Sequence, residues 1–114
     1  MAKDDYFVLA YKILAHLYAC LKQGEQPDSE YLNYGTKAFP IGESYWNYII
    51  QHLYEDGLVE GIHLIPMMGN TGYGIKGMRD IQITPRGIEY LSENSMMEKA
   101  KRTLKELKEI IPGL

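Results

Sequence analysis

The sequence contains only one cysteine, Cys20, so no intrachain disulfide can form. It also lacks an apolar run approaching the roughly 20 residues that a membrane-spanning helix needs. Its first residues, MAKDDYF, carry acidic side chains where a secretory signal has a basic flank and an apolar run. These absences predict a soluble cytoplasmic protein that makes no contact with a membrane.

The sequence also lacks the excess of basic residues that is typical of indiscriminate polyanion binders. Its 12 Lys and Arg residues stand against 15 Asp and Glu residues, for a formal net charge of -3. The charge is unevenly divided: residues 1–60 hold four basic and nine acidic residues, and residues 61–114 hold eight and six. Any contact with nucleic acid is therefore expected from the second half of the chain.

The residues that are present describe one small globular domain. The 114 residues are 46% hydrophobic and 24% charged, which is ordinary for a single domain. A domain this small buries only about two-thirds of its unfolded surface, so a second subunit would add stability. We therefore expect a homodimer.

The spacing of apolar residues predicts three helices in the first half of the chain. The first runs from a cap at Asp5 to about Gly24, the second is short and lies between Asp28 and Gly35, and the third runs from about Glu43 to Asp56. Gly57 ends the third helix. The residues expected to face inward are Phe7, Ala10, Leu14, Leu17 and Leu21 on the first helix, and Trp46, Ile49, Ile50 and Leu53 on the third.

The second half of the chain predicts a hairpin followed by helices. Residues 58–66 and 78–84 form two extended segments around a glycine-rich tip, and Thr84-Pro85 then caps a helix that Asn94-Ser95 interrupts. Residues 95–114 carry a narrow, heptad-like apolar stripe, which predicts a helix for docking or dimerisation. The stripe consists of Met97, Ala100, Leu104, Leu107 and Ile111.

This order of elements predicts an α+β fold that is mainly helical. Three helices, with the third running directly into a β-hairpin, are typical of a winged helix-turn-helix. We assign residues 1–94 to this winged-helix domain and residues 95–114 to a C-terminal helical extension.

Two phrases in the sequence resemble known proteins. Residues 53–61, from Leu53 to Gly61, and residues 83–91, from Ile83 to Leu91, resemble the corresponding stretches of many bacterial winged-helix regulators. Over nearly its full length, including residues 46–57 and the phrase Thr84-Pro85-Arg86-Gly87, the chain resembles the YjcQ family of small bacterial and prophage proteins. That resemblance implies the winged-helix fold and a bacterial or phage cytoplasmic setting, and it implies no catalytic or binding residues.

If the chain reads double-stranded DNA, the third helix is expected to enter the major groove. Its predicted outer face offers Ser44, Asn47, Tyr48 and Gln51, with His52 beside them, and the amides suit adenine edges. This helix contains no Lys or Arg, so phosphate contacts would come from other basic residues. These are Lys76, Arg79 and Arg86 in or beside the wing, and Lys99, Lys101, Arg102, Lys105 and Lys108 near the end of the chain. The leading interpretation is a non-enzymatic DNA-binding regulator that acts as a homodimer.

The alternative is a winged helix used for protein–protein contact. The chain has ten tyrosines, most of them expected in or near the core, such as Tyr11, Tyr18 and Tyr90. Tyr45, Tyr48 and Tyr73 are predicted to face outward, where aromatic rings provide a large contact area. An acidic surface around the third helix would favour this alternative over DNA binding.

Two motifs suggest chemistry but have plainer explanations. Residues 72–77 match the motif G-x-G-x-x-G of dinucleotide-binding sites. Such a site needs a helix directly after the glycines, but here a strand is predicted to follow. His16 and Cys20 lie four residues apart, but no further ligand completes a metal-binding pattern. We therefore expect no cofactor, no metal site and no catalytic residue.

Overall fold

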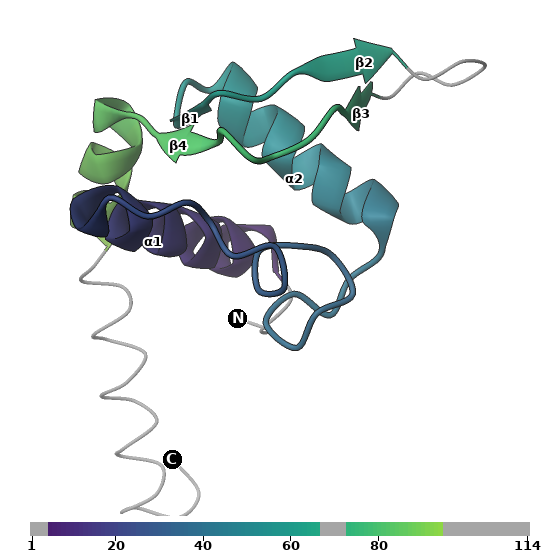
Figure 1. Cartoon of the computed structure of the whole chain (residues 1–114), viewed down its shortest axis with the longest axis horizontal. Coiled ribbons are helices and arrows are strands. Elements are labelled where there is room, and N and C mark those ends of the chain that lie inside the picture. The colour runs from purple at the N-terminus through teal and green to yellow at the C-terminus, as the bar shows by residue number, and fades with distance from the viewer. Residues whose placement is uncertain (1–4, 67–72, 95–114) are drawn as a thin grey trace, which may run out of the picture.

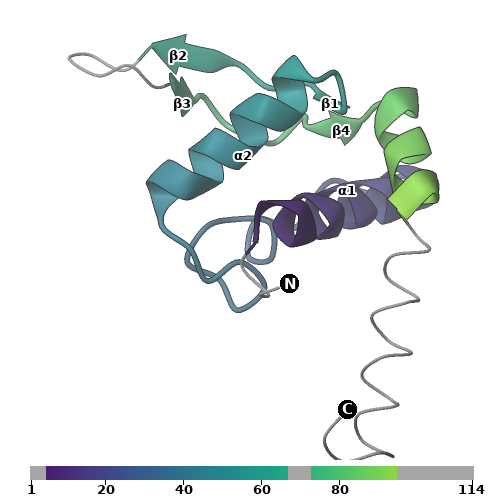
Figure 2. The same cartoon turned by 180° about the vertical axis from the view of Figure 1, so that it is seen from behind.

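The computed structural model describes residues 5–66 and 73–94, and it has the predicted α+β, winged-helix-like fold. Helix α1 spans Tyr6–Gln23 and helix α2 spans Glu43–Glu55. A further helix covers residues 85–94, up to the end of the described part. Figure 1 shows α2 crossing above α1, with the strands beside α2 and the 85–94 helix at one end. Figure 2, from behind, shows the same arrangement.

The strands form one long hairpin that is divided into two small antiparallel sheets. Strand β1 (Val59–Glu60) pairs with β4 (Gln82–Ile83), and β2 (Leu64–Pro66) pairs with β3 (Tyr73–Ile75). The predicted start of the returning arm at residue 78 is therefore wrong, since β3 begins at Tyr73. The hairpin bends between the two sheets, where Gly61 adopts a left-handed φ of 81°.

The core lies between α1, α2 and the sheet of β1 and β4. All four residues predicted to face inward on α2, including Trp46, are buried. The Trp46 ring packs edge-on against that of Phe39, with centroids 5.1 Å apart. Tyr11, Tyr18 and Tyr90 are partly buried and pack against the core, as predicted. This packing fixes the direction of α2.

The inward face of α1 differs from the prediction at its two ends. Ala10, Leu14 and Leu17 are buried as expected, whereas Phe7 is 60% exposed and Leu21 is also exposed. The buried stripe passes through Leu9, Ile13 and Cys20 instead, so Phe7 and Leu21 fall to one side of it. Asp5 occupies the N-cap position without the predicted side-chain hydrogen bond.

The predicted second helix is absent, and residues 28–38 form turns. One helical turn begins, because the Leu32 N–H donates to the Asp28 carbonyl at 2.8 Å. After this turn, side chains replace backbone groups as hydrogen-bond partners of the backbone. Asn33 Oδ1 accepts from the Tyr34 N–H, and the Thr36 hydroxyl donates to the carbonyls of Tyr31 and Asn33. Asp, Asn and Thr compete with helical hydrogen bonds in this way, and here that competition ends the helix after one turn.

The junctions on both sides of the hairpin have the predicted geometry. Gly57 follows α2 with φ of 76°, the left-handed conformation expected there. The Thr84 hydroxyl donates to the Gly57 carbonyl at 2.6 Å and accepts from the Gly87 N–H at 3.1 Å. Thr84 therefore caps the 85–94 helix and ties its start to the end of α2.

The predicted terminal helix over residues 95–114 lies outside the described residues. Within residues 5–66 and 73–94, no helix is long and apolar enough to span a bilayer.

Candidate functional site

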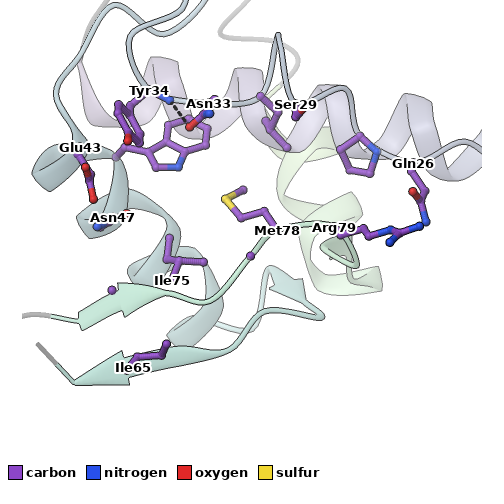
Figure 3. A pocket seen from close by; sticks show the side chains of 15 residues that line it. Gln26, Ser29, Asn33, Tyr34, Glu43, Asn47, Ile65, Ile75, Met78 and Arg79 are labelled. Atoms are coloured by element: carbon purple, nitrogen blue, oxygen red, sulfur yellow. Dashed lines mark hydrogen bonds between the residues drawn. The ribbon is translucent and has the colours of Figure 1, made fainter.

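A cleft of about 770 Å³ lies between α2, the hairpin and the turns that precede α2. Its floor is formed by the first turns of α2, and one wall by residues 26–34. The other wall follows the hairpin from β2 and β3 to Arg79 (Figure 3). This volume is in the range of natural binding sites for small molecules and short peptide segments.

The cleft has an apolar middle and charged ends of opposite sign. Ile65, Ile75 and Met78 lie between the two ends (Figure 3). Glu43 lies at one end and Arg79 at the other. A ligand that fits this arrangement is therefore elongated, apolar in its middle and oppositely charged at its ends.

The Glu43 end of the cleft is organised by Tyr34. The hydroxyl of Tyr34 donates a hydrogen bond to Glu43, and this bond together with the negative charge of Glu43 raises the pKa of Tyr34. Asn47, one turn further along α2, adds an amide to the same end of the cleft.

The structure separates the residues predicted to read DNA. Asn47 and Arg79 both line the cleft but at opposite ends of it, and Lys76 lies exposed two residues after Gly74 of β3. Ser44 is exposed but does not line the cleft. The side-chain amide of Gln51, which was predicted to contact DNA bases, donates a hydrogen bond to Glu55 Oε1 at 3.0 Å instead.

A second surface is formed where the start of α1 meets the outer side of α2. Tyr48 is 52% exposed, as predicted, and its ring lies 6.2 Å from that of Tyr6 and 4.2 Å from that of His52. Tyr6 in turn contacts the exposed ring of Phe7 at 5.2 Å. Two exposed carboxylates follow, Glu55 in the last turn of α2 and Asp56 directly after the helix. We call this set the acidic aromatic surface: Tyr6, Phe7, Tyr48, His52, Glu55 and Asp56.

The electrostatic environment of this surface is negative. Burial and the carboxylate of Asp56 raise the pKa of Tyr6 to about 12. His52 Nδ1 lies 3.9 Å from Glu55 Oε2. Tyr45 was predicted to face outward as well, but it is partly buried and packs against the core. Helix α2 carries no Lys or Arg to offset Glu43, Glu55 and the adjoining Asp56.

Several residues that line the cleft had no signal in the sequence. Its wall from Gln26 to Tyr34 overlaps the segment from Asp28 to Gly35 that was predicted as a short helix. Glu43 was considered as the start of the third helix and as one of its acidic residues, but not as part of a cleft. Met78 was expected within a strand, but it lies in the bend between β3 and β4. A tertiary contact between the turns and the hairpin creates this site, and neither segment has a motif that indicates it.

The His16–Cys20 pair is part of the packing of α1. Cys20 Sγ lies 3.6 Å from His16 Nε2, and the His16 ring packs against Tyr31. Burial raises the pKa of the Cys20 thiol and lowers that of His16, which leaves both groups neutral. In the described ranges, no three His, Cys, Asp or Glu side chains gather in a way that would hold a metal ion.

The remaining predicted site residues lie outside the described part of the chain. These are the side chain of Tyr73 and the stripe of Met97, Ala100, Leu104, Leu107 and Ile111. The glycine motif of residues 72–77 contains strand β3, including Gly74. A dinucleotide site needs the start of a helix at this place, so the motif does not form one.

The fold and the surfaces described above define a small winged-helix-like domain with an open cleft beside its hairpin. Comparison with family models identifies the particular family: residues 11–110 match the model described as YjcQ protein, so the chain belongs to the YjcQ family. No curated protein and no solved structure matches it significantly.

Proposed function

We propose that this YjcQ-family chain is a non-enzymatic module for protein–protein contact. The observation that carries the proposal is the acidic aromatic surface on the outer side of α2, the helix that a DNA-binding winged helix inserts into the major groove. Exposed aromatic rings provide a large contact area and are enriched at protein interfaces. Carboxylates in the same place repel phosphates, and each phosphate contact normally needs Lys or Arg.

The non-enzymatic part of the proposal rests on the chemistry of the described side chains. The only thiol, that of Cys20, is buried and its pKa is raised, whereas an activated cysteine nucleophile has a lowered pKa. The cleft contains one carboxylate and one guanidinium at its two ends, and the hydroxyl that contacts the carboxylate is the phenol of Tyr34, whose raised pKa makes it a poor nucleophile.

The partner that we propose for the acidic aromatic surface is residues 95–114 of a second copy. That segment has an apolar stripe, from Met97 to Ile111, and more basic than acidic residues: Lys99, Lys101, Arg102, Lys105 and Lys108 against Glu98, Glu106 and Glu109. Its charge and its apolar stripe complement the carboxylates and the rings of the surface. In a symmetric homodimer, residues 95–114 of each subunit would bind the acidic aromatic surface of the other subunit.

Tyr48→Ala is therefore expected to weaken the dimer at least about tenfold, because exposed tyrosines at the centre of an interface contribute disproportionately to affinity. The measurement is light scattering over a dilution series, in which a monomer has a mass of 13.1 kDa. Lys101→Glu with Lys105→Glu in the full chain should have the same effect. Tyr54→Ala is the control, since Tyr54 is 41% exposed on α2 but does not belong to the surface. A monomeric parent chain, or a dimer insensitive to Tyr48→Ala, would refute the proposed interface.

DNA binding is the second candidate, favoured by the exposed Lys76 and by Arg79, which shares the cleft with Asn47. If both basic residues contact phosphates, Lys76→Ala with Arg79→Ala should reduce the slope of log affinity against log salt by about 1.8. Asn47→Ala should instead lose about 1–3 kcal/mol of preference between sequences, at an unchanged slope. Absence of duplex binding at low salt, where phosphate attraction is strongest, would eliminate this candidate.

A further inference from the structure

The hairpin leaves one edge of β3 without a neighbouring strand among the described residues. Strand β3 pairs only with β2, and the pairs are Leu64 with Ile75 and Ile65 with Gly74. Just beyond β3, the Lys76 N–H donates to the His63 carbonyl at 2.9 Å. Residues of an antiparallel strand direct their backbone groups alternately toward the partner and away from it. Because Lys76 faces β2, the N–H and C=O of Ile75 face away from it.

The cleft runs along this free edge. Gly74, Ile75 and Gly77 all line it, and the turns of residues 26–34 form the wall opposite. The space between the two walls is open (Figure 3). Unpaired strand edges are templates for the addition of another strand, and natural proteins protect them with charges, prolines or a covering segment. Here the edge borders a cleft of about 770 Å³.

The side chains of the cleft specify what kind of strand would fit. Ile65 and Ile75 are only partly covered, and Met78 provides a flexible thioether beside them. Ile75 shares one face of the sheet with Leu64, whereas Ile65, which pairs with Gly74, lies on the other face. Side chains of an added strand alternate between these two faces, so those at every second position would lie on the face of Ile75. Glu43 at one end favours a basic residue, and Arg79 at the other favours a carboxylate.

We infer that the cleft binds an extended peptide segment by strand addition along β3. The segment has apolar residues at alternate positions, a basic residue at the Glu43 end and an acidic residue or C-terminal carboxylate at the Arg79 end. Its backbone exchanges hydrogen bonds with Ile75, as in other proteins that recognise peptides through a sheet edge. This site is separate from the acidic aromatic surface, because Asn47 lines the cleft whereas Tyr48 turns toward Tyr6. The inference therefore holds whether or not the dimer interface is correct.

A set of synthetic heptapeptides tests the inference on the full chain. Each peptide alternates valine with threonine and carries lysine at one end and glutamate at the other, in both orders. Trp46 is the single tryptophan of the chain and lines the cleft, so its fluorescence reports binding. One order should bind at least about tenfold more tightly than the other, since the charged ends specify the direction of the peptide.

Arg79→Glu should weaken the preferred peptide at least about tenfold. Exchanging the peptide's acidic end for a second lysine should then recover the binding to that variant. Arg86→Glu is the matched control: Arg86 is exposed but borders a different hollow, so the preferred peptide should bind as it does to the parent chain. Circular dichroism verifies that both variants are folded.

Backbone pairing is tested separately from apolar contact. Hydrogen exchange at the Ile75 amide should slow at least about tenfold when the peptide is bound, whereas the Lys76 amide, already bonded to His63, should change little. N-methylation of the peptide amides that face β3 should abolish binding, and methylation of the alternate amides should not. Equal binding of both methylated peptides, or no saturable binding by any peptide of the set, would overturn the inference. Light scattering of the same samples reports the dimer independently.

Discussion

Replacing Trp46 by alanine is expected to destabilise the domain strongly. Trp46 is only 2% exposed and lies among Ile49, Ile50 and the fully buried Phe39. Removal of a buried tryptophan side chain costs about 3–5 kcal/mol, because apolar contact is lost and a cavity remains. A domain of this kind has a total stability of about 5–15 kcal/mol, so the loss removes much or all of it. Thermal melting followed by circular dichroism measures the effect.

The control for this variant is Tyr54→Ala, on the same helix. Tyr54 is exposed, and substitutions at exposed positions usually change the free energy of unfolding by less than about 0.5 kcal/mol. If Trp46→Ala melts within a few degrees of Tyr54→Ala, the packing between α2 and the Phe39 ring does not hold the domain together. In that case α2 would not be a rigid floor for the cleft, and the proposed peptide site would not be preformed.

The second large effect is expected at Gly61, where the hairpin bends. Its φ of 81° lies in the left-handed region, and a Cβ added there would lie 2.0 Å from the carbonyl oxygen of Asp80 and 2.8 Å from its carbon. Gly61→Ala therefore combines left-handed strain with a clash against the returning arm. The two together should cost about 3 kcal/mol or more. Urea unfolding measures the loss.

Gly77→Ala separates the two contributions. Gly77 has nearly the same φ, 82°, but an added Cβ would meet no atom within 4 Å. This variant should therefore lose only the strain term, about 1–2 kcal/mol. Equal losses for Gly61→Ala and Gly77→Ala would mean that the two arms do not approach closely at Asp80. Since Arg79 precedes Asp80, that result would also place one end of the cleft differently.

The position of the cleft explains why the two candidate functions involve different parts of α2. Asn47 lies on the side of the helix that faces the hairpin, and Tyr48 lies on the side that faces Tyr6. The residues expected to form one DNA-reading face are thus distributed over two surfaces. The experiments on Tyr48 and on Arg79 address these surfaces one at a time.

The sequence by itself determined the elements whose signals are local. The apolar spacing of α2 specified Trp46, Ile49, Ile50 and Leu53 as its buried face, because a helix repeats every 3.6 residues whatever surrounds it. Gly57 and Thr84 specified the ends of helices, because a left-handed cap and a hydroxyl N-cap need particular residue types. The winged-helix-like order of elements followed from these signals.

Only the tertiary structure decided which segments meet. The turns of residues 28–38 replaced the predicted helix because their polar side chains bond to the backbone there, and Phe7 became exposed because the core covers only part of α1. The cleft exists because those turns and the hairpin both pack beside the start of α2. The acidic aromatic surface exists because the start of α1 reaches Tyr48. Such contacts join residues that are far apart in the chain, so no local pattern of apolar or polar residues indicates them.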